Sequence, residues 1–241
     1  MIRNLVLRGG PGHDFDATTA EVIGLLDAVG VESIVVDEPD EAFAALASAA
    51  AGSHPPIDLF TVLALRWQMR ASKYDADRVQ WAYTLAPRDG AVVESFVRAG
   101  GGLLALHTAV ICFDADPNWH AVCGGSWNWD RSSHPPLGPT RVEVTAAGRH
   151  HPITAAITDF DVVDEVYLDL DFVDDVEPLL VASVDGEPRA VCWARTLGAG
   201  RVVTDLLGHD AASLRHATHR EVLTRAVGWV CALPEFSGVP S

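Results

Sequence analysis

The first half of the chain alternates short apolar runs with segments of helical periodicity. Apolar runs at 2–7, 33–36, 58–63 and 103–106 are separated by amphipathic segments that begin near Asp16, Glu41 and Asp89. Strands that alternate with helices in this way form βαβ units, whose strands pair in parallel. The sequence therefore predicts an α/β fold with a doubly wound, mostly parallel central sheet flanked by helices.

The second half has a different pattern, which predicts an added antiparallel strand region. Residues 141–145 alternate, and residues 166–172 alternate strictly, as expected for a half-exposed strand. Asp185-Gly186 predicts a hairpin turn. The apolar run 201–207 is expected to return to the central sheet, and 211–233 to form one long closing helix.

Length and composition favour one domain spanning 1–241, with 234–241 as a flexible tail. Hydrophobic residues make up 49% of the chain, yet no apolar run is long enough to cross a bilayer. The first apolar run is too short for a signal peptide, so a cytoplasmic location is expected. The four cysteines are widely spaced, which predicts reduced thiols rather than disulfides or a zinc ribbon.

The charge balance excludes several partner classes. A net charge of -16 repels a phosphate backbone, so neither nucleic acid nor an anionic membrane is expected as a partner. Lys73 is the only lysine and does not lie in a glycine loop, which removes a P-loop and makes Schiff-base chemistry improbable. A neutral or cationic small molecule fits better, and a homodimer is compatible with the sequence.

Histidines follow several of the predicted strands. His13 follows the first strand, His107 the fourth, and His209-Asp210 the late strand that ends at Leu207. Ligands bind beyond the carboxyl ends of the strands in an open parallel sheet, so we expect these side chains to converge. Asp210 also fits the N-cap of the closing helix, where backbone donors could bind a sugar hydroxyl.

His107 occupies the most informative position. The run from Gly100 to Ala109 is a glycine-rich strand, an abrupt turn and the expected start of a helix, which is the layout of a nucleophile elbow. Histidine at such a turn suits proton transfer or metal ligation. The competing interpretation is that His107 only packs beneath a helix.

A series of motifs, in order along nearly the whole chain, resembles the ThuA-like (trehalose utilisation) family of the class I glutamine amidotransferase-like superfamily. The matching segments are Leu106-His107-Thr108-Ala109, Trp119 with Gly124-Gly125, Ser133-His134-Pro135, His151-Pro152-Ile153-Thr154, Asp164-Glu165-Val166-Tyr167, Cys192-Trp193, Gly198-Ala199-Gly200-Arg201-Val202 and Leu207-Gly208-His209-Asp210.

The resemblance implies a flavodoxin-like or amidotransferase-like fold without the amidotransferase nucleophile, because His107 stands where those enzymes carry a cysteine. It also implies a role in the metabolism of trehalose or related, oxidised sugars. Carried over residue by residue, it places His107, Glu165 and His209 in the pocket, with His13 and His134 as companions.

Three further expectations concern the site. Glu165 could be a general base or a metal ligand, although acidic residues more often form a solvated face. His107, Glu165 and His209 match the ligands of a catalytic divalent ion such as zinc, but no contiguous metal motif is present. Tryptophans could stack on sugar rings, although core packing is their commoner use; the candidates are Trp67, Trp127, Trp129 and Trp193.

The leading hypothesis is therefore an enzyme that isomerises or hydrolyses a sugar or keto-sugar. In it, His107 and Glu165 move protons and His209 polarises an oxygen. The alternative is a non-catalytic sugar-binding or regulatory domain that kept the fold. A glutaminase is disfavoured because no cysteine occupies the elbow.

Overall fold

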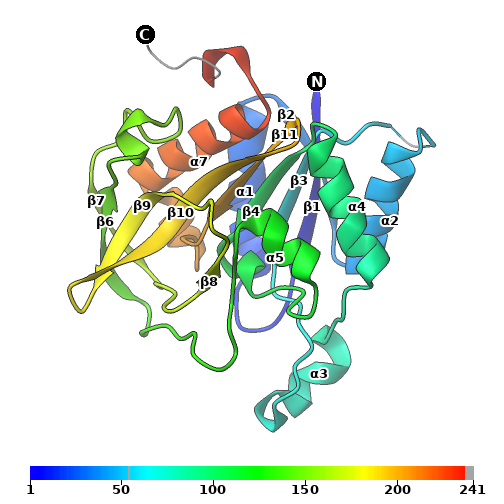
Figure 1. Cartoon of the computed structure of the whole chain (residues 1–241), viewed down its shortest axis with the longest axis horizontal. Coiled ribbons are helices and arrows are strands. Elements are labelled where there is room, and N and C mark those ends of the chain that lie inside the picture. Colours follow the sequence, from blue (N-terminus) through cyan, green and yellow to red (C-terminus); the bar gives the residue numbers. More distant parts are fainter. Residues whose placement is uncertain (54, 237–241) are drawn as a thin grey trace.

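The computed structural model describes residues 1–53 and 55–236. These residues form a nine-stranded mixed sheet with helices on both faces (Figure 1), in the order β2-β1-β3-β4-β11-β10-β9-β6-β7. A separate two-stranded sheet pairs β5 with β8. The strands are β1 (Ile2–Gly9), β2 (Val31–Val36), β3 (Leu59–Ala64), β4 (Gly102–Leu106), β5 (Gly125–Ser126), β6 (Gly138–Val144), β7 (Phe160–Asp164), β8 (Asp171–Phe172), β9 (Pro178–Val184), β10 (Glu187–Leu197) and β11 (Gly200–Asp205).

The parallel half of the sheet confirms the predicted α/β fold. β2, β1, β3, β4 and β11 all run in the same direction, and β11 returns to pair with β4 as expected. Every residue of β3 is buried, because helices cover both faces of this strand. The carboxyl ends of these strands therefore share one edge of the sheet, on the side where α3 projects (Figure 1).

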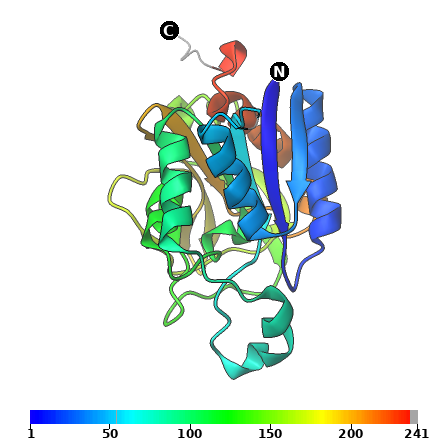
Figure 2. The same cartoon turned by 90° about the vertical axis from the view of Figure 1, so that its right-hand side faces the viewer.

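Two helical layers enclose the sheet, as Figure 2 shows from the side. α1, α6 and α7 pack together on one face, and α2, α4 and α5 cover the other. The helices are α1 (Phe15–Ala28), α2 (Pro39–Ala50), α3 (Asp75–Trp81), α4 (Pro87–Arg98), α5 (Pro117–Cys123), α6 (Ala211–Arg215) and α7 (Ala217–Val230), and the 3-10 turns are η1 (Ser72–Tyr74), η2 (His107–Val110), η3 (Gly148–His150) and η4 (Pro234–Phe236).

The antiparallel half is built from hairpins, as predicted. Asp185 and Gly186 both have positive φ, at 53° and 83°, and they close the β9–β10 hairpin. Positive φ at both central positions is the requirement of a type I′ turn, which glycine and aspartate meet at low steric cost. β6 and β7 then extend the sheet beyond β9.

The predictions of three secondary-structure elements were wrong. The closing helix divides into α6 and α7 because His216 has an extended backbone, with ψ of 126°. The continuous strand at 166–172 is an irregular segment that ends in β8, and Asp169 interrupts it with φ of 55°. The helix expected directly after the His107 turn is the single 3-10 turn η2, and α5 begins only at Pro117.

The expected tail 234–241 is only partly covered. Pro234–Phe236 forms η4, and 237–241 lie outside the described residues. Across the helices that the structure describes, none combines the length and apolar character needed to span a membrane.

Candidate active site

Four side chains from distant parts of the sequence meet at the carboxyl edge of the sheet. His13 follows β1, His107 follows β4, Glu165 follows β7 and His209 follows β11. One potential ligand atom from each side chain lies within 4.8 Å of those of the other three. We call this group the His–Glu cluster; its atom types are those that hold transition-metal ions in proteins.

The backbone at His107 is strained, and its side chain is held in one orientation. His107 has φ of 48°, a left-handed conformation that is uncommon outside glycine and that turns the chain sharply after β4. Its Nδ1 lies 2.7 Å from the carbonyl oxygen of Leu206, to which only a protonated nitrogen can donate. Nε2 therefore carries the lone pair, and it faces Nε2 of His13 at 3.2 Å.

Burial keeps two of the imidazoles neutral. The pKa of His107 lies well below its ordinary value, mainly because of burial and secondarily because of His13. Burial, together with His209, lowers the pKa of His13 to about 4. Both rings are thus uncharged at pH 7, and they are weak proton carriers but effective lone-pair donors.

Glu165 connects the cluster to a more exposed histidine. Its Oε2 lies 3.3 Å from Nδ1 of His209 and 3.8 Å from Nε2 of His107. Its Oε1 lies 3.4 Å from Nδ1 of His134, whose side chain is 42% exposed. The carboxylate therefore contacts both the histidines of the cluster and His134 at the edge of the cavity.

Asp164 ties two of the cluster-bearing segments together. Its carboxylate, 2% exposed, accepts hydrogen bonds from the backbone nitrogens of Gly208 at 2.7 Å and His209 at 3.2 Å. It also accepts from the backbone nitrogen of Glu165 at 2.8 Å and from the hydroxyl of Ser213. The loop after β11 and the segment after β7 are thus held in a fixed relation.

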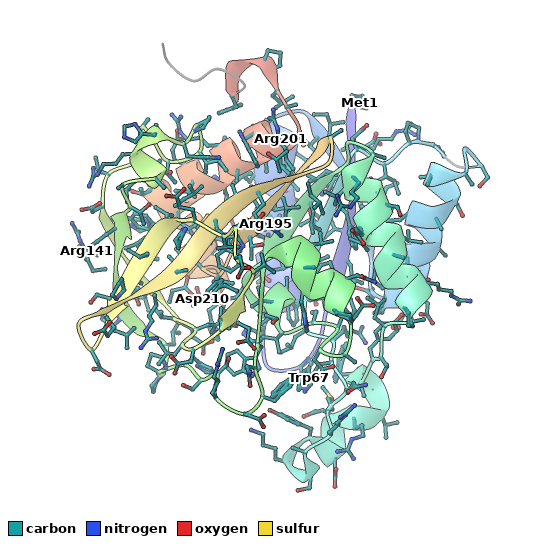
Figure 3. All side chains as sticks on the ribbon, viewed as in Figure 1. Met1, Trp67, Arg141, Arg195, Arg201 and Asp210 are labelled. Carbon is teal, nitrogen blue, oxygen red and sulfur yellow. The ribbon has the colours of Figure 1, made fainter. Side chains whose placement is uncertain are left out.

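An aromatic wall faces the cluster across a cavity of about 390 Å³. The rings of Trp67 and Trp129 are stacked, with centroids 5.8 Å apart, and Tyr74 meets Trp67 edge-on. Trp129 Nε1 donates to Asp114 at 2.9 Å, which fixes the ring. Trp67 lies where the chain leaves the body toward α3 (Figure 3). The volume is in the range of small-molecule sites.

The structure brings most of the proposed site residues to this cavity. Its lining includes His13, Trp67, Trp127, Trp129, His134, Glu165, Tyr167 and His209. His107 forms the buried floor through its contacts with His13 and Tyr167.

Two of the proposed site residues serve elsewhere. Trp193 is fully buried in β10, and its Nε1 donates to the carbonyl of Cys123 at 2.7 Å, so its ring does not face the cavity. Asp210 caps α6 by accepting from Ser213 N at 2.9 Å, as the sequence predicted.

Sequence reasoning did not select Tyr167 or Asp164. The Tyr167 hydroxyl lies 3.1 Å from Nε2 of His107, and its pKa is raised well above the ordinary value, chiefly by burial. Both residues lie in the motif Asp164-Glu165-Val166-Tyr167. The period-two pattern after Glu165 suggested a strand, on which Tyr167 would have shared a face with Glu165 and Asp169.

A larger groove of about 1040 Å³ lies at the opposite edge of the sheet. Alanine, glycine and other apolar residues of α2, α4 and the α7 end form most of its lining, with Asp58, Arg88 and Arg201 as its charged members. Among the described residues, no group like the His–Glu cluster lies in this groove.

Comparisons with known proteins agree with this architecture. The ThuA family model, described as trehalose utilisation, matches residues 71–230. A crystal structure of a protein described as ThuA-like from Parabacteroides merdae is 14% identical with a TM-score of 0.70, covering 95% of this chain and 90% of that one. The β-galactosidase from Rahnella sp. R3 is 13% identical with a TM-score of 0.59, covering 96% of this chain but 31% of that one. A search of curated proteins found no match.

Proposed function

Because this chain belongs to the ThuA family, we propose that it is an enzyme that isomerises or hydrolyses a carbohydrate in the cavity above the His–Glu cluster. The single observation that supports the proposal is the meeting of an aromatic wall with a partly buried group of imidazoles and a carboxylate. Sugar rings present C–H faces that pack on indole rings, and their hydroxyl and carbonyl oxygens suit polar groups opposite.

The residues around the cavity supply groups for proton transfer. Glu165 is 8% exposed and contacts both His134 and His209, so a proton can pass between the carboxylate and the cavity. The Tyr167 hydroxyl, adjacent to His107, can donate to an oxygen that becomes negative during the reaction. Isomerisation next to a carbonyl and hydrolysis of a glycosidic bond both need such a base and such a donor.

The test is a turnover screen on trehalose, related disaccharides and their keto derivatives, with products followed by NMR. We expect turnover of one sugar class, and a fall of about 10²- to 10⁴-fold in kcat for Glu165→Gln, the usual contribution of a general acid–base group. Asp161→Asn, on the exposed side of the preceding strand, is the matched control and should keep wild-type turnover. If the wild type binds a sugar but does not turn it over, the protein would instead be a sugar-binding or regulatory domain.

A further inference from the structure

Several separations within the His–Glu cluster are close to those of a coordination shell, and all four ligand atoms lie within 4.8 Å of one another. Zinc binds imidazole nitrogen at about 2.0–2.1 Å, so two ligand atoms of a tetrahedral site lie about 3.3 Å apart. The atoms here are separated by 3.2 Å between His13 and His107 and by 3.3 Å between Glu165 and His209. The 3.8 Å between His107 and Glu165 is slightly longer. Two of these three separations match the edges of such a tetrahedron.

Hydrogen bonds elsewhere on the rings direct lone pairs toward the centre of the cluster. His107 donates from Nδ1 to the carbonyl of Leu206, and Nδ1 of His13 faces the carbonyl of Pro11 at 3.5 Å. Metal-ligating histidines characteristically donate their second N–H to a carbonyl or carboxylate. Nδ1 of His209 is buried and has no hydrogen-bond partner among the described residues. Nε2 of His107 can accept from the Tyr167 hydroxyl at 3.1 Å, whereas Nδ1 of His209 has no such donor in the described part of the chain, so the converging nitrogens are only partly satisfied.

We propose that His13, His107, Glu165 and His209 bind one divalent transition-metal ion, with zinc as the best match. Three imidazoles and one carboxylate are ligand types that zinc prefers, and a site with one carboxylate ligand would carry a single positive charge. The net charge of -16 favours capture of a cation. His13 thereby becomes a ligand rather than only a substrate-binding residue.

The ion would also divide the chemistry among the residues, and this part of the inference rests on the proposed function. Imidazoles and a carboxylate that ligate a metal do not carry protons, so Glu165 would act as a ligand in place of a base, and His134 and Tyr167 become the proton-transfer groups next to the cavity. A zinc site can expand to five ligands when a substrate oxygen approaches. The substrate class is then a sugar with a carbonyl or hydroxyl oxygen that could coordinate the ion. The ion would act as a Lewis acid and polarise that oxygen.

Metal binding can be measured without any sugar. The protein is dialysed against a chelator, and ZnCl₂ and MnCl₂ are titrated separately by calorimetry, with elemental analysis of the untreated protein. We expect one zinc per chain, tighter binding of zinc than of manganese, and at least about 100-fold weaker zinc binding in His13→Ala and in His209→Ala. Both side chains are partly exposed, so these two substitutions should disturb folding less than a substitution of the buried His107.

His150→Ala, which removes an exposed histidine remote from the cluster, should bind zinc as the wild type does. The proposal is overturned if the wild type binds neither metal stoichiometrically, or if His13→Ala and His209→Ala keep wild-type affinity for zinc. Stoichiometric binding at the cluster by a protein that turns over no sugar would uphold the metal site and remove the proposed function. Undiminished turnover after complete metal removal would remove the ion's role in the reaction.

Discussion

Replacing Asp164 by alanine would leave three buried hydrogen-bond donors and one partly buried donor without their acceptor. These donors are the backbone nitrogens of Glu165, Gly208 and His209 and the hydroxyl of Ser213. An unsatisfied buried donor costs about 1–3 kcal/mol, and water entering the space left by the side chain would recover part of that sum. With four donors and partial recovery by water, we expect a loss of about 3–5 kcal/mol in the free energy of unfolding.

This loss has a thermal equivalent that is simple to measure. For a domain of this size, 1 kcal/mol lowers Tm by about 2–4 °C, so Asp164→Ala should lower it by roughly 6–20 °C. Differential scanning calorimetry gives Tm, and urea unfolding gives the free energy directly. Asp164→Asn keeps the shape of the side chain but replaces one acceptor with a donor. Its Tm should therefore lie between those of the wild type and Asp164→Ala.

Asp161 offers a matched control on the same strand. Its side chain is 76% exposed and forms a surface ion pair with Arg141 at 3.0 Å, a contact that contributes less than about 1 kcal/mol. Asp161→Ala should therefore melt close to the wild type. Equal Tm values for Asp164→Ala and Asp161→Ala would refute the view that Asp164 ties the two segments together.

Three other perturbations test separate parts of the structure. Burial lowers the pKa of His219, but Asp205, 3.3 Å away, outweighs it and raises the pKa overall. The resulting stability should be present below about pH 6.5 and lost as pH rises through the folded pKa, and urea unfolding of His219→Gln should lack this loss. Gly200→Ala would place a Cβ 2.0 Å from the carbonyl oxygen of Val97, so its Tm should fall by an amount equivalent to about 1–3 kcal/mol or more. Trp129→Ala should weaken sugar binding in calorimetry by about 0.5–1.5 kcal/mol for the lost ring contact, with little change in Tm, because this ring is 45% exposed. Unchanged affinity would exclude Trp129 from the sugar site.

The convergence of the histidines was predictable because it depends on the parallel sheet alone. The apolar runs that became β1, β4 and β11 identify three strands, and parallel strands end at a common edge. His107 and His209 follow two of these strands and lie in the cluster. The resemblance to the ThuA family selected Glu165, which follows the antiparallel strand β7, and no pattern in the residues alone indicated that it would reach the same place.

The features that were missed depend on tertiary contacts. The alternating pattern after Glu165 resembles a strand, but Val166, Tyr167 and Leu170 are all buried, which a regular alternation does not allow. Asp169 adopts a left-handed conformation that local sequence only weakly favours. Asp164 resembled its many surface-exposed acidic neighbours, because nothing in the sequence shows which backbone nitrogens a carboxylate will meet.

The excursion formed by η1 and α3 projects from the body of the molecule (Figures 1 and 2). It contributes Tyr74 and Asp77 to the cavity, and its contact with the core is limited to the partly buried rings of Tyr74 and Trp81 among the described residues. Insertions or replacements there would remodel the entrance without disturbing the sheet that positions the His–Glu cluster. Changes confined to this excursion are therefore expected to alter which molecules reach the cavity while leaving the His–Glu cluster in place.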